Sequence, residues 1–305
     1  MIDIRRLIQA GTQFGHQHKW GNPKSRRFLW GTKNGIDLID VSQTAFLAQK
    51  AAQFLENLAS EGKEILWCGT KKAAQKAIVA VEQDQWPIVK HRWVGGTFTN
   101  PIEVRKAVRK YGENKDIIEK SDRHHFTKKE LSVLNKVTER LSKTVGGIES
   151  LKWPVGALVV VDVRKEHVAV REAIASGIPV VALVDTNASP DGILYPIPAN
   201  DDGEESVSLI VAEYLLKAAT AGREKYRATQ KVAPAPEATS SNVVNDKQDK
   251  NQIEMQLAAV EASLDQDEQK ATRKVSPSSR QPSRRTPHRG NRSSEGTKPN
   301  NRPKR

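Results

Sequence analysis

Two continuous apolar runs near the middle of the chain constrain the fold most. Ala157–Asp162 and Pro179–Val184 carry apolar side chains at nearly every position, a pattern typical of central parallel strands buried on both faces. Between them, Glu166–Ser176 has helical character and is followed by Gly177 and Pro179, which commonly end helices. Because parallel neighbours need a crossover connection, this segment predicts a strand–helix–strand unit.

The same alternation of strands and helices extends over most of the chain. Ile36–Asp40 alternates apolar and polar residues and predicts a strand, and Val41–Leu58 has apolar residues at helical spacing. The further elements expected are a strand at Glu64–Cys68, a helix from the turn Gly69–Lys72 to Val81, a weaker strand at Trp86–Lys90 and an amphipathic helix over Val207–Ala218. This order predicts an α/β fold, with a parallel sheet and helices on both faces.

One long segment, 101–145, has no strand pattern. Val104, Val108 and Tyr111 form a thin apolar stripe at helical spacing. A second stripe follows a polar stretch and consists of Leu131, Leu134, Thr138, Leu141 and Val145. Two helices with narrow apolar seams predict an inserted antiparallel, coiled-coil-like hairpin.

The distribution of aromatic residues divides the chain. All sixteen Trp, Phe and Tyr residues lie at or before Tyr226. Residues 227–305 have few apolar residues, and 271–305 carry 11 basic residues and one acidic residue. A segment of this kind buries too little surface to offset the entropy of ordering. We therefore expect a folded domain over 1–226 and a disordered low-complexity tail over 227–305 that is basic at its end.

Composition excludes several classes of protein. The single cysteine, Cys68, excludes an intramolecular disulfide framework and a cysteine-cluster zinc site. No apolar run approaches the ~18 residues of a membrane span, and the first residues turn polar too soon for a signal peptide. The formal charge of +13 and a pI of about 9.7 indicate an acidic partner, most commonly nucleic acid. Charge alone does not separate that partner from an anionic membrane or from a merely soluble surface.

Catalysis has little support in the sequence. Neither a G-x-G-x-x-G nor a G-x-x-x-x-G-K-[ST] motif is present. The turn Gly69–Lys72 could present N–H groups and lysines to a phosphate, and an ordinary strand–helix loop explains it equally well. Carboxylates at expected strand ends and in loops fit catalytic roles or turn and capping roles equally: they are Asp162, Asp185, Asp191, Asp201 and Asp202. No nucleophile, base and orienting group stand together, so we expect no catalytic residue and no cofactor.

Two histidine pairs are a further candidate for chemistry. His16 and His18 are two residues apart, and His124 and His125 are adjacent at the expected hairpin tip. A metal site would need further ligands, and the neighbouring sequence supplies none. A structural or RNA-contact role is favoured over metal binding, which stays open for either pair.

Two basic clusters with aromatic residues give the clearest signal. His16–Lys33 contains no acidic residue and five cations, which are Lys19, Lys24, Arg26, Arg27 and Lys33. Trp20, Phe28 and Trp30 are interleaved with them. Cations neutralise phosphates and exposed aromatic rings stack on bases; the alternative is that Phe28 and Trp30 pack in the core. The second cluster is Lys90–Trp93, followed by paired glycines and Asn100.

The motifs together resemble one known family. In order they are Phe14-Gly-His16, Asn22-Pro-Lys24, Asn34-Gly-Ile36, Ile39-Asp40, Gly69-Thr-Lys-Lys-Ala-Ala74, His91-Arg-Trp-Val-Gly-Gly96, Thr99-Asn100, Gly146-Gly-Ile148, Glu166-His167, Gly177-Ile-Pro179, Val184-Asp-Thr-Asn187, Pro190-Asp-Gly192, Ile197-Pro198 and Asn200-Asp-Asp202. Over about residues 3–226 the chain resembles the bacterial-type small-subunit ribosomal protein S2 family. It departs from the family pattern at Gly21, Ser25 and Thr97-Phe98, and in a less acidic end of the second hairpin helix.

The resemblance implies a fold, a location and partners. It implies a flavodoxin-like α/β domain with a helical hairpin, and a structural rather than enzymatic role in the cytoplasmic small ribosomal subunit. It also implies binding to small-subunit rRNA between head and body on the solvent side, and help in holding the mRNA-binding ribosomal protein S1. The rRNA-contact candidates are Lys19, Lys24, Arg26, Arg27, Lys33, Lys71, Lys72, His91, Arg92 and Asn100. The rival classes are a nucleotide-binding α/β enzyme and an extracellular adhesive module, and no membrane partner is expected.

Overall fold

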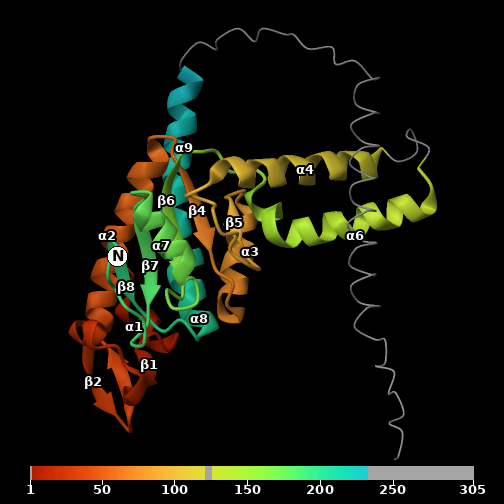
Figure 1. Cartoon of the computed structure of the whole chain (residues 1–305). Coiled ribbons are helices and arrows are strands. Elements are labelled where there is room, and N and C mark those ends of the chain that lie inside the picture. The colour runs from red at the N-terminus through yellow and green to blue at the C-terminus, as the bar shows by residue number, and fades with distance from the viewer. Residues whose placement is uncertain (1, 121–125, 233–305) are drawn as a thin grey trace, which may run out of the picture. The chain divides into compact units, whose positions relative to one another are not determined.

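The computed structural model describes residues 2–120 and 126–232, with side chains described to 229 (Figure 1). Its strands form a five-stranded sheet of order β5-β4-β6-β7-β8 and a three-stranded sheet of order β1-β3-β2. The predicted hairpin tip with His124 and His125, and the predicted tail from 233 onward, lie outside the described residues.

The five-stranded sheet is parallel throughout. Its strands are β4 (Glu64–Cys68), β5 (Ile88–Val89), β6 (Val155–Val161), β7 (Val180–Val184) and β8 (Tyr195–Pro198). The predicted buried runs are its two central neighbours, β6 and β7, joined by helix α7 (His167–Ala175) as expected. The flavodoxin-like α/β fold is therefore confirmed.

The predicted strand at Ile36–Asp40 does not belong to this sheet. It forms β3 (Ile36–Ile39), which pairs antiparallel with β1 (Phe14–Gln17) and β2 (Leu29–Lys33). Asn34 and Gly35 have φ of 54° and 75°, the left-handed pair of a two-residue hairpin turn. Alternation identifies a strand without identifying its neighbour, so the assignment to the parallel sheet was wrong.

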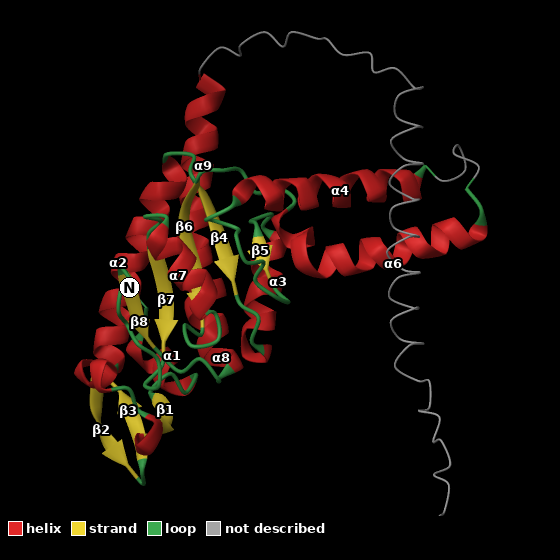
Figure 2. Cartoon of the chain, viewed as in Figure 1, coloured by secondary structure: helices red, strands yellow, loops and turns green. Residues whose placement is uncertain are grey.

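Helices cover both faces of the parallel sheet, as predicted (Figure 2). One core contains α2 (Val41–Ser60), α3 (Gln75–Gln83) and the C-terminal helices packed on Val159, Val161, Val181 and Leu183. The other contains α7 packed on Leu158, Val160 and Ala182. The C-terminal helices are α8 (Glu204–Val207), a π-helical segment η5 (Ser208–Leu215) and α9 (Leu216–Val232), which continues past the expected boundary at 226.

The predicted hairpin consists of α4 (Pro101–Glu119) and α6 (Lys128–Val145), which lie side by side (Figure 1). Thr127 and Glu130 form a reciprocal capping box that begins α6. Val104 and Val145 are buried in the second core at the base of the hairpin. Asn114 is also buried, and its Nδ2 has no hydrogen-bond partner among the described residues.

The remaining elements are short. They are α1 (Ile4–Gln9) and the 3-10 turns η1 (His18–Trp20), η2 (Pro23–Phe28), η3 (Lys72–Ala74) and η4 (Gly146–Ile148). Within the described ranges, no helix combines the length and the apolar character that a bilayer crossing requires.

Candidate nucleic-acid interface

Residues 14–39, hereafter the N-terminal lobe, present five of the predicted candidates. Asn22 caps η2 by accepting the Lys24 N–H at 3.0 Å, and Pro23 occupies the first helical position. This turn buries Ser25 and Phe28 and leaves the cations between them, Arg26 and Arg27, exposed. Lys19, Lys24 and Lys33 are also exposed.

The lobe also exposes two indole rings. Trp20 is 60% exposed and Trp30 is 77% exposed, whereas Phe28 is buried. Of the two aromatics that the alternative placed in the core, only Phe28 packs there. The Lys19 amine lies 5.4 Å from the Trp20 ring centroid. Exposed indole rings can stack on unpaired bases, while neighbouring cations neutralise the phosphates.

Lys24 differs from its neighbours because it has an acidic partner. It forms an ion pair with Asp191, from the loop after β7, and this contact lowers the pKa of the Asp191 carboxyl. Arg26 and Arg27 form no ion pair within the described residues. The local sequence lacks an acid, but the fold brings one from 167 residues away.

Three hydrogen bonds attach the lobe to the loop that follows β7. The His16 N–H donates to Thr186 Oγ1 at 2.9 Å, the Asn22 N–H donates to the Thr186 carbonyl at 2.8 Å, and the Ser25 hydroxyl donates to the Ala188 carbonyl at 2.6 Å. A Cβ on Gly15 would lie 2.3 Å from Thr186 Cγ2, so the close approach requires glycine. These motif residues therefore connect the lobe to the sheet.

Lys71 lies in a cluster of carboxylates at the carboxyl edge of the sheet. Its amine is 2.6 Å from both Asp201 and Asp202 and 3.3 Å from Asp162. Burial lowers the pKa of Lys71, but hydrogen bonds to Asp201 and Asp202 outweigh it and raise that pKa overall. The carboxylates of the chain itself thus compensate the positive charge of Lys71, which is partly buried, whereas Lys72 is exposed.

The turn that carries Lys71 behaves as a structural loop. The Thr70 hydroxyl bonds the Glu166 carboxylate, and the Lys165 amine donates to the Thr70 carbonyl at 2.9 Å. The chain's own groups therefore engage the side chain of Thr70 and of Lys71. This geometry favours the ordinary strand–helix loop over a phosphate loop.

His16 completes the carboxyl-edge cluster. Its Nδ1 lies 3.0 Å from Asp185 and its Nε2 3.2 Å from Asp202. The hydrogen bond to Asp185 raises the pKa of His16 despite partial burial, and nearby carboxylate charges add to this shift. Among the described residues, His16, Asp185 and Asp202 form a group with ligand atoms within 4.8 Å of one another, which has the donor chemistry of a divalent-cation site. His18 instead pairs with Asp37 at 2.7 Å.

The loop between β5 and α4 presents the other candidates. Glu172 of α7 accepts hydrogen bonds from Trp93 Nε1 at 3.2 Å, the Gly96 N–H at 2.9 Å and the Phe98 N–H at 3.2 Å. His91 and Arg92 precede this anchored segment and are exposed. Asn100 is exposed at the start of α4, where its side chain makes no capping bond.

The ten candidates therefore do not form one cluster. Five lie on the N-terminal lobe, Lys71 and Lys72 follow β4, and three lie on the loop before the hairpin. Sequence reasoning missed Glu172 and Ser25 as positioning residues, because their partners are 74 or more residues away in the chain.

Comparison with known proteins supplies the class of the chain. A family profile described as "Ribosomal protein S2" matches residues 7–222. A protein of Corynebacterium urealyticum named "Small ribosomal subunit protein uS2" is 40% identical over 240 residues, which is 78% of this chain and 88% of the relative. Proteins of the same name are 43% identical in Micrococcus luteus, over 69% of this chain and 74% of the relative, and 40% identical in Pseudoalteromonas translucida, over 73% and 92%.

These matches decide between the classes that the sequence left open. A profile that spans most of the described domain, together with relatives aligned over most of their own length, agrees with the predicted family. This agreement favours the ribosomal family over the two rival classes, a nucleotide-binding α/β enzyme and an extracellular adhesive module. The chain belongs to the ribosomal protein S2 family, and as such is a structural constituent of the cytoplasmic small ribosomal subunit rather than an enzyme.

Proposed function

We propose that the N-terminal lobe binds small-subunit rRNA, with Arg26 and Arg27 on phosphates and Trp20 and Trp30 on unpaired bases. The observation that carries this is Trp30, an indole exposed by 77% in the stretch His16–Lys33, whose charged residues are all basic. Burying such a ring in a partner stabilises a complex through stacking. Lys19 and Lys33 extend the same surface, and Lys24 contributes less because Asp191 already pairs with it.

The second part of the proposal concerns the loop before the hairpin. His91, Arg92 and Asn100 form a separate contact, presented by a backbone that Glu172 holds. Lys72 is a further surface cation, whereas Lys71 acts as a structural ion-pair partner.

The family resemblance supports a position for these contacts. In this proposal the chain binds rRNA between the head and the body on the solvent side of the small subunit, and it helps to retain ribosomal protein S1. Small subunits reconstituted without this chain should retain less S1 after sedimentation. Equal retention would contradict this part of the proposal and leave the rRNA contact standing.

The rRNA contact is tested by salt dependence. Each lost phosphate contact lowers the slope of log K against log salt by about 0.7 to 0.9. The variant Arg26→Ala/Arg27→Ala should therefore bind small-subunit rRNA with a slope shallower by about 1.5. A matched control is Arg171→Ala/Lys217→Ala, which removes two exposed cations of α7 and α9 and should leave the slope unchanged. Equal slopes in the two variants would refute the assignment.

The stacking contact has a different signature. Trp30→Ala should weaken rRNA binding by about 1–3 kcal/mol without changing the salt slope, because no charge is lost. Its thermal stability should match that of the parent, since the ring makes little contact with the fold. Unchanged affinity would contradict the stacking role.

A further inference from the structure

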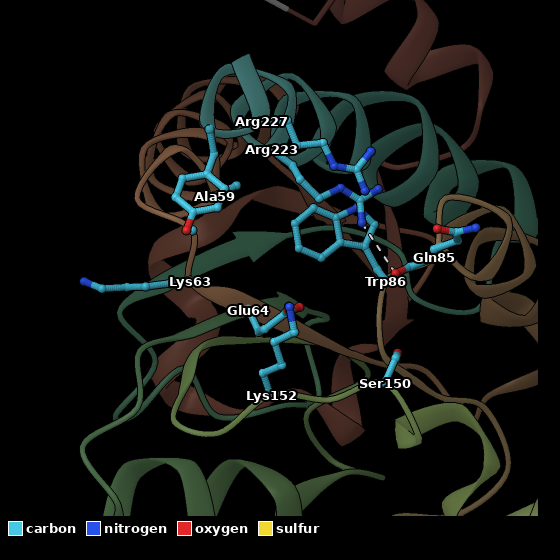
Figure 3. Close-up of a pocket in the computed structure, with 11 residues that line it drawn as sticks. Ala59, Lys63, Glu64, Gln85, Trp86, Ser150, Lys152, Arg223 and Arg227 are labelled. Atoms are coloured by element: carbon cyan, nitrogen blue, oxygen red, sulfur yellow. Dashed lines mark hydrogen bonds between the residues drawn. The ribbon is translucent and has the colours of Figure 1, made fainter. Parts of the chain in front are cut away.

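A pocket of about 490 Å³ lies at the amino ends of the strands of the parallel sheet, hereafter the amino edge. Figure 3 shows the residues that line it. Segments leading into three parallel strands line it, namely Lys63 and Glu64 at β4, Gln85 and Trp86 before β5, and Ser150 and Lys152 before β6. Helix α9 closes it with Arg223, Tyr226 and Arg227. The volume falls in the range of sites that hold one small organic group.

The lining of this pocket is strongly basic. It contains four cations, on Lys63, Lys152, Arg223 and Arg227, and one carboxylate, on Glu64. Lys63 pairs with Glu61 at 2.7 Å. The other three cations form no ion pair within 4 Å in the part of the chain that the structure describes. An anionic group in the pocket would supply the charge that the lining lacks.

Arg223 is held in a defined position at the pocket wall. Its guanidinium lies 4.2 Å from the Trp86 ring centroid, and it donates to the carbonyls of Asp84 and Gln85. Figure 3 shows it reaching across the indole ring. A guanidinium has five N–H donors in a planar fork, and these two contacts leave others for a ligand.

At the wall of this pocket that α9 forms, the backbone packs closely and two arginines repel each other. A Cβ on Gly62 would lie 2.4 Å from the Tyr226 ring, so glycine allows α9 to approach the turn before β4. Burial lowers the pKa of Arg223 and the positive charge of Arg227 lowers it further, outweighing the charges of Asp84, Glu64 and Glu224, which raise it. An anion between the two arginines would relieve this repulsion.

We propose that the amino-edge pocket binds one nucleotide of an RNA chain, with its phosphate between Arg223, Arg227 and Lys152. A fork-shaped guanidinium pre-positioned on an aromatic ring matches the geometry of a phosphate. The pocket has no glycine-rich loop or helix N-terminus to cradle the phosphates of a free nucleotide, so its long cationic side chains favour a phosphodiester. This is a second RNA contact, at the opposite edge of the sheet from the lobe, and it rests on the proposed RNA-binding function.

The test uses the full chain and a mixed-sequence single-stranded 12-nucleotide RNA. Lys152→Ala/Arg227→Ala removes two exposed lining cations and should lower affinity roughly tenfold and reduce the salt slope by about 0.7, the value for one single-strand phosphate. The control Arg171→Ala/Lys217→Ala should change neither. Unchanged affinity and slope in the pocket variant, with loss of binding in Arg26→Ala/Arg27→Ala, would overturn the pocket and leave the proposed function intact.

A second measurement identifies the source of the phosphate. The indole N–H resonance of Trp86 should shift on titration with the 12-nucleotide RNA in the parent chain, and Arg227→Lys should retain this shift. Adenosine monophosphate and inorganic phosphate should shift it at least tenfold more weakly. Small anions as effective as the RNA would overturn the assignment to an RNA chain.

Discussion

Glu172 offers the sharpest test of how the loop at 93–98 is held. Its carboxylate accepts three N–H groups, two on Oε1 from Trp93 and Gly96 and one on Oε2 from Phe98. Trp93 and Phe98 are buried and pack edge to face at 5.1 Å. One side chain of α7 therefore satisfies three donors in a segment that has no regular structure.

The variant Glu172→Gln keeps the shape of the side chain and changes its hydrogen bonding. The amide oxygen can still accept from Trp93 and Gly96, but the NH₂ group that replaces Oε2 faces the Phe98 N–H as a second donor. The loss of a charged acceptor that leaves a buried N–H unpaired costs about 1.5–3 kcal/mol. Glu139→Gln is the matched control, because Glu139 forms an exposed i,i+4 pair with Lys143, and exposed pairs of this kind contribute little to stability.

Urea unfolding of the two variants measures this difference. Glu172→Gln should lower the free energy of unfolding by several times the effect of Glu139→Gln, with an unchanged slope against urea. Amide exchange should also accelerate at Gly96 and Phe98. A Glu172→Gln protein within about 0.5 kcal/mol of the parent, with unchanged exchange at these amides, would refute the anchoring role.

Three further predictions concern the core, the lobe attachment and pH. Val159, buried in β6, tolerates no charge, so Val159→Asp should abolish folding, whereas Val159→Ala should cost about 1–4 kcal/mol; native circular dichroism of Val159→Asp would contradict this. Gly15→Ala should destabilise by about 1–3 kcal/mol through its clash with Thr186 and speed proteolysis within the lobe; unchanged melting and cleavage would contradict it. Burial and the charges of Asp185 and Asp162 outweigh the lowering effect of Lys71 and raise the pKa of Asp201 to about 7, so its contribution to stability is present at low pH and is lost as pH rises through 7. His16, whose pKa is also raised, contributes to stability with the same pH dependence. The midpoint of urea unfolding, measured with EDTA present, should therefore fall between pH 5 and pH 8, and Asp201→Asn should make this fall smaller. A midpoint that rises with pH would contradict the predicted direction.

The central sheet could be predicted from the sequence because strands that are buried on both faces have a distinct apolar pattern. β6 and β7 are covered on both faces, so nearly every side chain is apolar. β8 was not predicted, since Tyr195–Pro198 contains two prolines, which are tolerated at the edge position that it occupies. The Asn34–Gly35 turn between β2 and β3 carries a hairpin signal that would have separated the small sheet.

Which of the candidate cations form ion pairs within the protein could not be predicted from the sequence. A local count finds no acid near Lys24 and none beside Lys71, yet the fold brings Asp191 to the first and three carboxylates to the second. Arg26 and Arg27, two and three residues after Lys24, form no such pair within the described residues. Pairing between residues so far apart in the chain depends on the tertiary structure, which the local sequence pattern does not contain.

The same contacts are consistent with the RNA-binding role proposed for this flavodoxin-like sheet. In open parallel sheets, ligands usually bind beyond the carboxyl ends of the strands, where the strand order reverses. Here the order reverses between β4 and β6, and at that point Lys71 after β4 bridges to Asp162 after β6 at 3.3 Å, while Thr70 bonds Glu166. The N-terminal lobe docks on the neighbouring loop after β7 through Thr186 and Ala188. The usual ligand position is thus filled by the chain's own side chains, and the RNA contact proposed for the lobe lies instead on its outer face, where Arg26, Arg27 and Trp30 are exposed.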